Sequence, residues 1–448
     1  MPASPSRVLT GITTSGTPHL GNYVGAVRPA IAASRDPGSE SFFFLADLHS
    51  LIKAQDPART QRSTLEIAAT WLAAGLDPAR VWFYRQSDIP EISELTWYLT
   101  CVAGKGILNR AHAYKAAVDR NRAEGEDDDA GVTAGLFMYP VLMAADILIF
   151  NAQRVPVGRD QVQHIEMARD FGQRFNHVYG RDWFTLPEAV VEAHVATLPG
   201  LDGRKMSKSY GNTIPLFAPP EELRRLVFSI VTDSRAPGEA KDTEGSALYE
   251  LYRAFADDEG AAAFAAAFAD GIAWGEAKQR LANLLEREIA PLRERYLDLV
   301  ARPGDIEDIL RDGARRLRER YATPLLAQLR EAVGLRDLSQ LRLDANDTDA
   351  ESSSGRAAPP AFKQYREADG RFYFKLVQGE RVLLQSHAFD APRDAGQAIA
   401  ALRRGALPLP QAPAALGEGV AEADVRAALD ALAAADAEKA AKAAKAQP

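Results

Sequence analysis

From residue 7 to about residue 215 the chain alternates between short strands and helices, and this alternation restricts it to folds built on a largely parallel sheet. Within the segment 41–47, apolar residues run without a break from 42 to 46, as in a strand buried on both faces. The expected strands are 7–10, 41–47, 80–88 and 154–158. The expected helices are 22–34, 64–76, 140–150, with Pro140 near its first turn, and 160–175. The sequence therefore predicts an α/β fold.

The pattern changes after this region. Helical periodicity alone continues from Pro219 to about Leu335, with short loops, which predicts a helical bundle. Residues 344–360 are polar, acidic and rich in Ser and Pro, as in a flexible linker. Two strands around Gln378-Gly379 and one helix follow. The predicted division is a sheet domain at 1–217, a helical domain at 218–340, a linker at 341–361, a small α+β module at 362–405 and a low-complexity tail at 406–448.

Composition excludes several classes of protein. The 448 residues hold 53 Lys and Arg against 61 Asp and Glu, a net charge of −8, whereas a protein that coats long DNA is usually basic. Neither a membrane-spanning apolar run nor a signal peptide is present in the sequence. Cys101 is the single cysteine, so the chain has no intramolecular disulfide and no Cys-rich metal site. We expect a reducing, cytoplasmic location and no membrane or DNA partner.

A glycine-rich turn, GITTSGTPHLGNYVGA at 11–26, joins the first strand to the first helix. Gly11, Gly16 and Gly21 allow tight turning and close approach of a ligand to the backbone. A helix N-terminus suits phosphate, and His19 and Asn22 add side-chain hydrogen-bond donors. Neither GxxxxGK[ST] nor GxGxxG occurs here. The turn alone is equally compatible with His19 acting only as a cap.

A second segment, GRKMSKSYGN at 203–212, places Lys205 and Lys208 in a loop between glycines. Both lysines and the hydroxyls of Ser207 and Ser209 can donate to phosphate oxygens. On its own this loop is better explained as a solvated surface loop.

Together the two segments resemble the paired signatures of class I aminoacyl-tRNA synthetases. Residues 17–22, TPHLGN, are similar to the HIGH motif with Asn22 in place of the second histidine, and 205–209 is KMSKS unchanged. The resemblance implies a Rossmann-like catalytic domain, a helical anticodon-binding domain, and catalytic roles for His19, Asn22, Lys205 and Lys208. It also implies ATP contacts from Thr13, Thr14, Ser15, Gly21, Asn22, Gly158, Arg159, Asp160, Lys205, Met206, Ser207, Lys208 and Ser209.

Five stretches across residues 7–335 resemble bacterial tryptophanyl-tRNA synthetases: GNYVGA, FLADLHSL, YPVLMAADIL, VPVGRDQVQHIEMARDFGQRFN and KMSKS. The related tyrosine enzymes usually carry a KFGKS or KFGKT loop. The implied tryptophan-binding residues are Gly11, Ala46, His49, Tyr139, Met143, Asp146 and Gln161, with Gln161 holding the α-amino group.

The chemistry of Asp146 agrees with this resemblance. Its carboxylate lies in an otherwise apolar run, where burial without a donor costs several kcal/mol. An indole offers one N–H and no acceptor, so a carboxylate in an apolar slot distinguishes indole from phenyl. The alternative is that Asp146 is paired with a nearby arginine. Asp160 has two compatible readings, a ribose ligand and a helix N-cap.

The chain departs from the family pattern at two places. Thr13 stands where the family often has glutamine, so the polar contact of that turn is open. The loop between Lys115 and Val132 carries an acidic run at 124–129 where relatives are lysine-rich, so no pyrophosphate role is assigned to the run and Lys115 is only a substitute candidate.

The resemblance implies activation of L-tryptophan by ATP to tryptophanyl-adenylate and pyrophosphate, then transfer to tRNA(Trp), with Mg²⁺ carried by ATP and a homodimeric enzyme. Arg311, Arg315 and Arg318 share a helix face that suits tRNA phosphates or a solvated, salt-bridged surface. A tyrosyl-type synthetase and a non-catalytic tryptophan-sensing or RNA-binding paralogue remain the alternatives. The module at 362–405 carries a net charge of +3, resembles a small ββα module weakly, and either contacts tRNA or serves packing and solubility.

Overall fold

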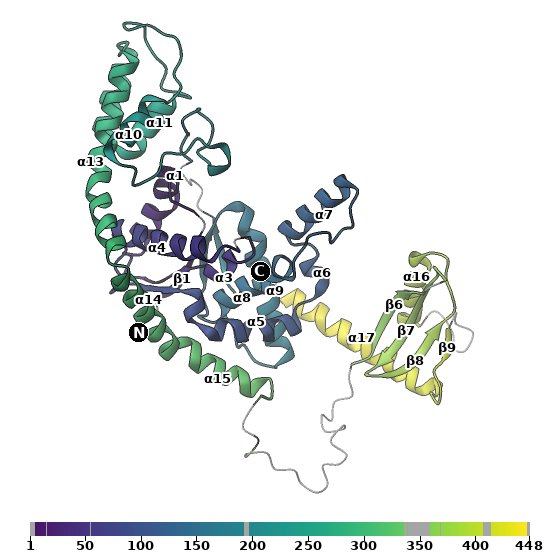
Figure 1. Ribbon diagram of the computed structural model, residues 1–448. Coiled ribbons are helices and arrows are strands. Elements are labelled where there is room, and N and C mark those ends of the chain that lie inside the picture. Colours follow the sequence, from purple (N-terminus) through teal and green to yellow (C-terminus); the bar gives the residue numbers. More distant parts are fainter. Residues whose placement is uncertain are drawn as a thin grey trace. The chain divides into compact units, whose positions relative to one another are not determined.

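The computed structural model describes residues 5–14, 16–53, 55–191, 197–335, 338, 359–367, 369–405 and 414–445, with side chains to 436. The chain forms two compact units, Met1–Arg336 and Asp337–Pro448, which are described separately (Figure 1). Among the described residues no helix is both long enough and apolar enough to cross a membrane.

The first unit is built on a parallel sheet. Its strands are β1 (Ser6–Ile12), β2 (Ser39–Leu45), β3 (Trp82–Arg85), β4 (Arg154–Val157) and β5 (Glu188–Val191), in the order β3-β2-β1-β4-β5. The four predicted strands are confirmed, and β5 was not predicted because it is a short edge strand with half-exposed side chains. The strand order reverses between β1 and β4, and ligands of open α/β sheets bind in the crevice at such a point.

Helices cover the sheet on both sides. The helical segments of this region are α1 (Leu20–Asn22), the π-helical η1 (Tyr23–Val27), α2 (Arg28–Ala33), α3 (Asp47–Ser50), α4 (Pro57–Ala73), η2 (Gln86–Asp88), α5 (Pro90–Val102), α6 (Lys105–Leu108), α7 (His112–Glu124), α8 (Ala134–Leu148), η3 (Arg159–Gln161), α9 (Val162–Val178) and η4 (Lys208–Tyr210). The prediction that Pro140 lies in the first turn of its helix is wrong. The helix α8 begins a turn and a half earlier, where the Thr133 hydroxyl accepts from Leu136 N–H, and Pro140 lies inside it.

The helical region is confirmed and packs directly on the sheet domain. It contains α10 (Pro220–Phe228), α11 (Ala247–Phe255), α12 (Asp258–Ala269), α13 (Trp274–Ala301), α14 (Pro303–Leu317), the π-helical η5 (Arg318–Ala322) and α15 (Thr323–Ala332). Helix α13 lies along α4 and α14 lies on β3. A Cβ on Gly313 would come within 1.9 Å of the Phe83 carbonyl oxygen, so α14 reaches β3 only because this residue is glycine.

The second unit is a four-stranded antiparallel sheet with two helices. Its strands are β6 (Ala361–Arg366), β7 (Phe372–Gln378), β8 (Arg381–Ser386) and β9 (Ala414–Leu416), in that order, and its helices are α16 (Pro392–Arg403) and α17 (Glu422–Lys445). The predicted hairpin and helix are confirmed. The prediction of a tail from 406 onward is wrong for β9 and α17, since Val425 and Ala428 are buried in the core of this unit. Most of the predicted linker lies outside the described residues.

Candidate active site

The glycine-rich turn leaves the carboxyl end of β1 and enters α1 through a reciprocal cap. His19 Nδ1 accepts from Asn22 N–H at 3.2 Å, and Asn22 Oδ1 accepts from His19 N–H at 3.1 Å. Burial, with a smaller contribution from the nearby Lys208 charge, lowers the pKa of His19 to about 4. His19 is therefore neutral at pH 7. Because Nδ1 accepts, Nε2 carries the ring hydrogen.

Backbone contacts hold the KMSKS loop against this turn. Leu20 N–H donates to Ile214 carbonyl and Leu216 N–H donates to Pro18 carbonyl, both at 3.0 Å. Met206 is buried in the hydrophobic cluster that also contains Leu20. The two segments that the sequence singled out separately therefore form one structural element.

Lys208 lies at the centre of this junction. A Cβ on Gly16 would be 3.0 Å from Lys208 Nζ, so the ammonium group lies directly beside the backbone of the turn. Partial burial, and next the charge of Arg59 on α4, lower the pKa of Lys208, while Glu66 opposes them. Arg59, which was not predicted, brings a further cation near the loop from the first turn of α4.

Buried Asn212 fixes the shape of the loop that carries both lysines. Its Oδ1 accepts from Ser207 N–H at 2.8 Å, and its Nδ2 donates to Asp202 at 2.6 Å and to the Lys205 carbonyl at 3.2 Å. The Ser207 and Ser209 hydroxyls are hydrogen-bonded to each other at 2.8 Å. Lys205 and Lys208 remain on the exposed side of the loop.

The remaining residues of the turn differ in their accessibility. Thr13 is exposed, whereas Thr14 is buried and its hydroxyl is hydrogen-bonded to Ser50 Oγ at 2.6 Å. The predicted ATP contact of Ser15 lies outside the described residues. Gly11 is at the end of β1, with Phe44 so close that a Cβ would lie 3.0 Å from its ring.

A cavity begins beside this turn at the point where the strand order reverses. Residues of β1, β4 and the α1–α2 segment line it, with an apolar and small-residue surface near the carboxyl ends of the strands. These residues include Thr10, Gly11, Gly25, Ala26, Val157 and Gly158. A Cβ on Gly158 would come within 2.7 Å of Asp160 Oδ1, so the position of Asp160 requires glycine there.

Four side chains form a hydrogen-bonded chain across η3, α8 and α9. Tyr139 O–H lies 2.5 Å from His164 Nε2, and His164 Nδ1 lies 2.8 Å from Gln161 Oε1. Gln161 Nε2 in turn donates to Asp160 Oδ2 at 2.8 Å. An amide oxygen only accepts, so His164 Nδ1 carries the hydrogen and Nε2 accepts from Tyr139. Burial lowers the pKa of His164, which favours this neutral form.

This arrangement connects predicted tryptophan contacts to the predicted ribose contact. The N-cap alternative for Asp160 is wrong: the caps of η3 and α9 are Gly158 and Gln161, and neither uses a side chain. Asp160 is exposed at the end of β4 beside Arg159, so its remaining acceptor sites face outward. His164 was missed, although it lies three residues from Gln161 on the same helical face.

Asp146 is fully buried in α8 and satisfied by two other side chains. Gln86 Nε2 lies 2.8 and 3.0 Å from its two oxygens, and His49 Nε2 lies 3.0 Å from Oδ2. The arginine alternative is therefore wrong. Burial raises the pKa of Asp146, and the His49 and Gln86 hydrogen bonds oppose that rise. Gln86 was not predicted, and its one sequence signal was its position at the carboxyl end of β3.

The other predicted tryptophan contacts surround this group. His49 and Tyr139 are in edge-to-face contact, with ring centroids 6.5 Å apart. Ala46 is buried at the carboxyl end of β2, and half-buried Met143 lies on α8 one turn before Asp146. The structure thus gathers residues from four different segments around one carboxylate.

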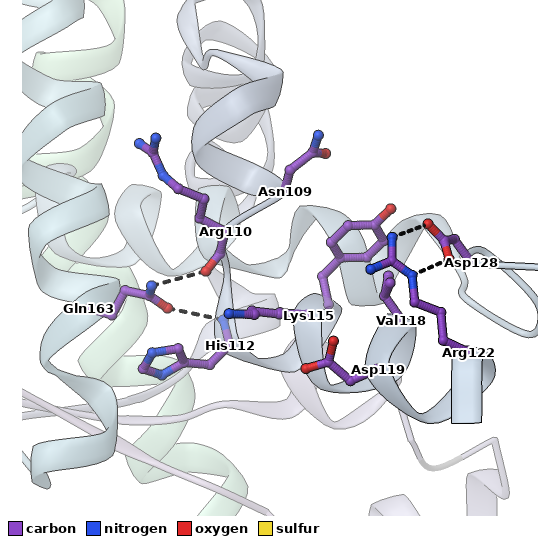
Figure 2. A pocket seen from close by; sticks show the side chains of 10 residues that line it. Asn109, Arg110, His112, Lys115, Val118, Asp119, Arg122, Asp128 and Gln163 are labelled. Atoms are coloured by element: carbon purple, nitrogen blue, oxygen red, sulfur yellow. Dashed lines mark hydrogen bonds and ion pairs between the residues drawn. The ribbon is translucent and has the colours of Figure 1, made fainter. Parts of the chain in front are cut away.

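The acidic run at 124–129 folds back on α7 (Figure 2). Asp128 forms a two-bond ion pair with Arg122 at 2.7 Å, and Asp129 accepts from the Tyr114 hydroxyl at 2.7 Å. Lys115, Arg122 and Asp128 line one surface pocket. Gln163 of α9 connects to α7, because its side-chain oxygen accepts a hydrogen bond from His112 N–H. Asp128 and Asp129 are therefore held by the helix that precedes them.

The three arginines that the sequence places on one helix face have acidic partners. Arg311 is paired with Glu307 at 2.7 Å, and Arg315 with Asp312 and Glu319. Arg318 binds buried Glu91 of α5 at 2.9 Å, and its π-helical position displaces it from regular α-helical spacing. All three line one surface cavity. The contact with tRNA remains a prediction.

Comparisons with known proteins agree with this geometry. The model of the family "tRNA synthetases class I (W and Y)" matches residues 1–289. The tryptophan–tRNA ligase of Xanthomonas axonopodis pv. citri is 71% identical over 437 residues, which cover 96% of this chain and 99% of that relative. The chain belongs to the family of bacterial tryptophanyl-tRNA synthetases. The corresponding ligase of Pseudomonas aeruginosa is 63% identical, over 87% of each chain.

A solved structure of this family matches only part of the chain. The tryptophanyl-tRNA synthetase of Campylobacter jejuni, complexed with ADP and tryptophan, is 39% identical with a TM-score of 0.67. The match covers 99% of that protein but 73% of this chain. About a quarter of this chain therefore has no counterpart in the Campylobacter enzyme, whereas the Xanthomonas relative is matched almost throughout.

Proposed function

We propose that this chain activates L-tryptophan with ATP and transfers the tryptophanyl group to tRNA(Trp). The observation that carries the proposal is the position of Lys208 beside the backbone of the glycine-rich turn, which unites two separate phosphate-binding signatures in one site. The tryptophan–tRNA ligase names of its relatives supply the amino acid.

In the first step, a carboxylate oxygen of tryptophan attacks the α-phosphorus of ATP. The bond from that phosphorus to the bridging oxygen breaks, and pyrophosphate leaves. No protein nucleophile is needed, so the rate depends on positioning and on stabilising negative charge. Neutral His19 donates from Nε2, and Lys205 and Lys208 neutralise the leaving pyrophosphate. The adenosine is proposed to occupy the cavity between β1, β4 and Gly25, with Asp160 accepting from the ribose hydroxyls.

In the second step, a hydroxyl of the 3′-terminal ribose of tRNA attacks the tryptophanyl carbonyl carbon. AMP leaves as the new ester forms, and the proton of the attacking hydroxyl passes to the released phosphate oxygen. Mg²⁺ is proposed to arrive on the ATP phosphates. Such binding suits Mg²⁺, which keeps several waters and uses few protein ligands, and the described residues contain no cluster of three His, Cys, Asp or Glu that could hold a metal.

The buried Asp146 group is proposed to select the indole ring. The carboxylate has about four acceptor sites, and Gln86 and His49 use three. The indole N–H fits the remaining site, while an apolar ring edge would leave it unsatisfied. Gln161, held by His164, is proposed to orient the α-amino group. We further propose a homodimer that works in the cytoplasm, as expected for a synthetase.

The test is amino-acid-dependent exchange of pyrophosphate into ATP, measured separately with each of the twenty amino acids. Tryptophan alone should support rapid exchange. Exchange with tyrosine instead would favour the tyrosyl-type alternative, and no exchange with any amino acid would favour a non-catalytic paralogue.

A further inference from the structure

The second unit exposes one face of its sheet. Helices α16 and α17 pack on the opposite face, where Phe374, Leu376 and Leu384 form the core with Val425 and Ala428. Side chains alternate along a strand, so the neighbouring residues point to the other face. In the described part of this unit, no helix packs on that other face.

The uncovered face carries two stacked aromatic rings. Tyr365 of β6 and Tyr373 of β7 are directly opposite each other, and their rings stack with centroids 5.8 Å apart and planes 21° apart. Gln385 of β8 reaches the Tyr365 hydroxyl at 2.6 Å. Both rings are half-buried, so each presents part of its surface to solvent.

Two lysines, Lys363 and Lys375, lie beside the tyrosines. Lys363 is directly opposite Lys375, and Lys375 is directly opposite Gln385, all on the uncovered face. The Lys375 ammonium lies 5.4 Å from the Tyr365 ring centroid. Like charges directly opposite in an antiparallel pair are unfavourable, and neither lysine forms an ion pair with an acid among the described residues. A bound polyanion would remove this repulsion.

We propose that this face binds an unpaired segment of the tRNA substrate. Bases stack on exposed aromatic rings, lysines neutralise the backbone phosphates, and an amide such as Gln385 can hydrogen-bond base edges. A four-stranded antiparallel sheet with aromatics on its open face is a common support for single-stranded RNA. Asp369, which accepts from the Tyr373 hydroxyl at 2.7 Å, limits the phosphate path to the lysine side of the rings. The choice of tRNA as occupant rests on the proposed ligase function.

The first measurement uses the full chain and a labelled oligoadenylate of about ten nucleotides. The Lys363→Gln/Lys375→Gln variant should make the dependence of log affinity on log salt less steep by about 1.4, from two phosphate contacts with single-stranded RNA. The Tyr365→Leu/Tyr373→Leu variant should bind about 10- to 100-fold more weakly, whereas Tyr365→Phe/Tyr373→Phe should bind within about threefold of wild type.

The matched control removes two positive charges from the other side of the unit. Arg393 and Arg404 are exposed at the two ends of α16, and Arg393→Gln/Arg404→Gln should leave both affinity and salt dependence unchanged. Equal losses of RNA affinity in the lysine variant and this control would overturn the proposal. RNA binding would then depend on the net charge of the unit and not on this face.

The second measurement is aminoacylation of tRNA. Each weakened variant should raise the KM for tRNA, more so at low salt, while tryptophan-dependent pyrophosphate exchange stays at the wild-type rate. An unchanged KM for tRNA would overturn the proposal even if oligoadenylate binding falls. Absence of pyrophosphate exchange in the wild-type chain would instead contradict the proposed function itself.

Discussion

The phosphate end and the amino-acid end of the site are built on opposite principles. At the phosphate end, Lys205 and Lys208 are exposed on a loop that backbone hydrogen bonds and Asn212 hold in place. At the amino-acid end, Asp146 is fully buried and already hydrogen-bonded to Gln86 and His49. Exposed cations can follow charge that appears only during the reaction. A buried, satisfied carboxylate instead offers one fixed acceptor to a neutral ring.

The largest expected effect is at the phosphate end. Lys208→Ala should slow adenylate formation by about 10²-fold or more, because its charge is needed when the charge of the leaving pyrophosphate develops. Single-turnover formation of tryptophanyl-adenylate measures this rate. Lys208→Arg, which keeps the charge, should lose less. Adenylate formation at the wild-type rate in Lys208→Ala would remove Lys208 from the mechanism.

The next effect is at the amino-acid end. Asp146→Ala removes a charged-group hydrogen bond and should cost roughly 1.5–3 kcal/mol in kcat/KM for tryptophan. Tyrosine and phenylalanine should gain relative to tryptophan in the exchange assay. The variant also leaves the Gln86 amide without its partner, so a thermal melt should accompany the kinetics. An unchanged kcat/KM for tryptophan would show that Asp146 does not contact the indole.

The cap at His19 predicts a pH dependence of stability. The pKa of His19 is lowered to about 4, whereas an unfolded histidine titrates near 6.5. Between these values the unfolded chain binds more protons, so stability falls as pH falls. His19→Asn keeps a capping oxygen without titrating. Between pH 7 and 4 the wild type should lose about 2–3 kcal/mol more than His19→Asn, because each pKa unit between the folded and unfolded states is worth 1.36 kcal/mol. If denaturant titrations show the same loss of stability in wild type and His19→Asn, the lowered pKa of His19 is contradicted.

The smallest effect concerns the second unit. Both ends of the site belong to Met1–Arg336, so a chain ending at Asp344 should keep tryptophan-dependent pyrophosphate exchange within about threefold, or ~0.65 kcal/mol. Loss of exchange on truncation would show that the second unit supports the catalytic unit. Activity would then depend on the second unit as well as on the two ends of the site.

The sequence predicted the parts of the fold that local pattern determines. The local alternation of strand and helix patterns identified β1 to β4, and His19 and Lys208 stood in recognisable motifs. Residues with no local pattern were missed. Gln86 is hydrogen-bonded to Asp146 and His164 to Tyr139, and both partners lie on a different segment of the chain. A single sequence contains no signal for such pairing.

Composition misled the prediction in two places. Pro140 suggested a helix start, but α8 begins at the Thr133 cap and continues through the proline. The alanine-rich C-terminal segment suggested a tail, yet alanine suits a helix face that packs closely on a sheet, as Ala428 does. In both cases tertiary packing outweighed local preference.

The most direct test of the contrast between the two ends is equilibrium binding of tryptophan without ATP to three proteins. Calorimetric titration would compare wild type, Lys208→Ala and Asp146→Ala. We expect Lys208→Ala to bind tryptophan within about twofold of wild type, because no phosphate charge is present without ATP. Asp146→Ala should bind tryptophan about tenfold or more weakly. Equal weakening in both variants would contradict the separation of the phosphate end from the amino-acid end.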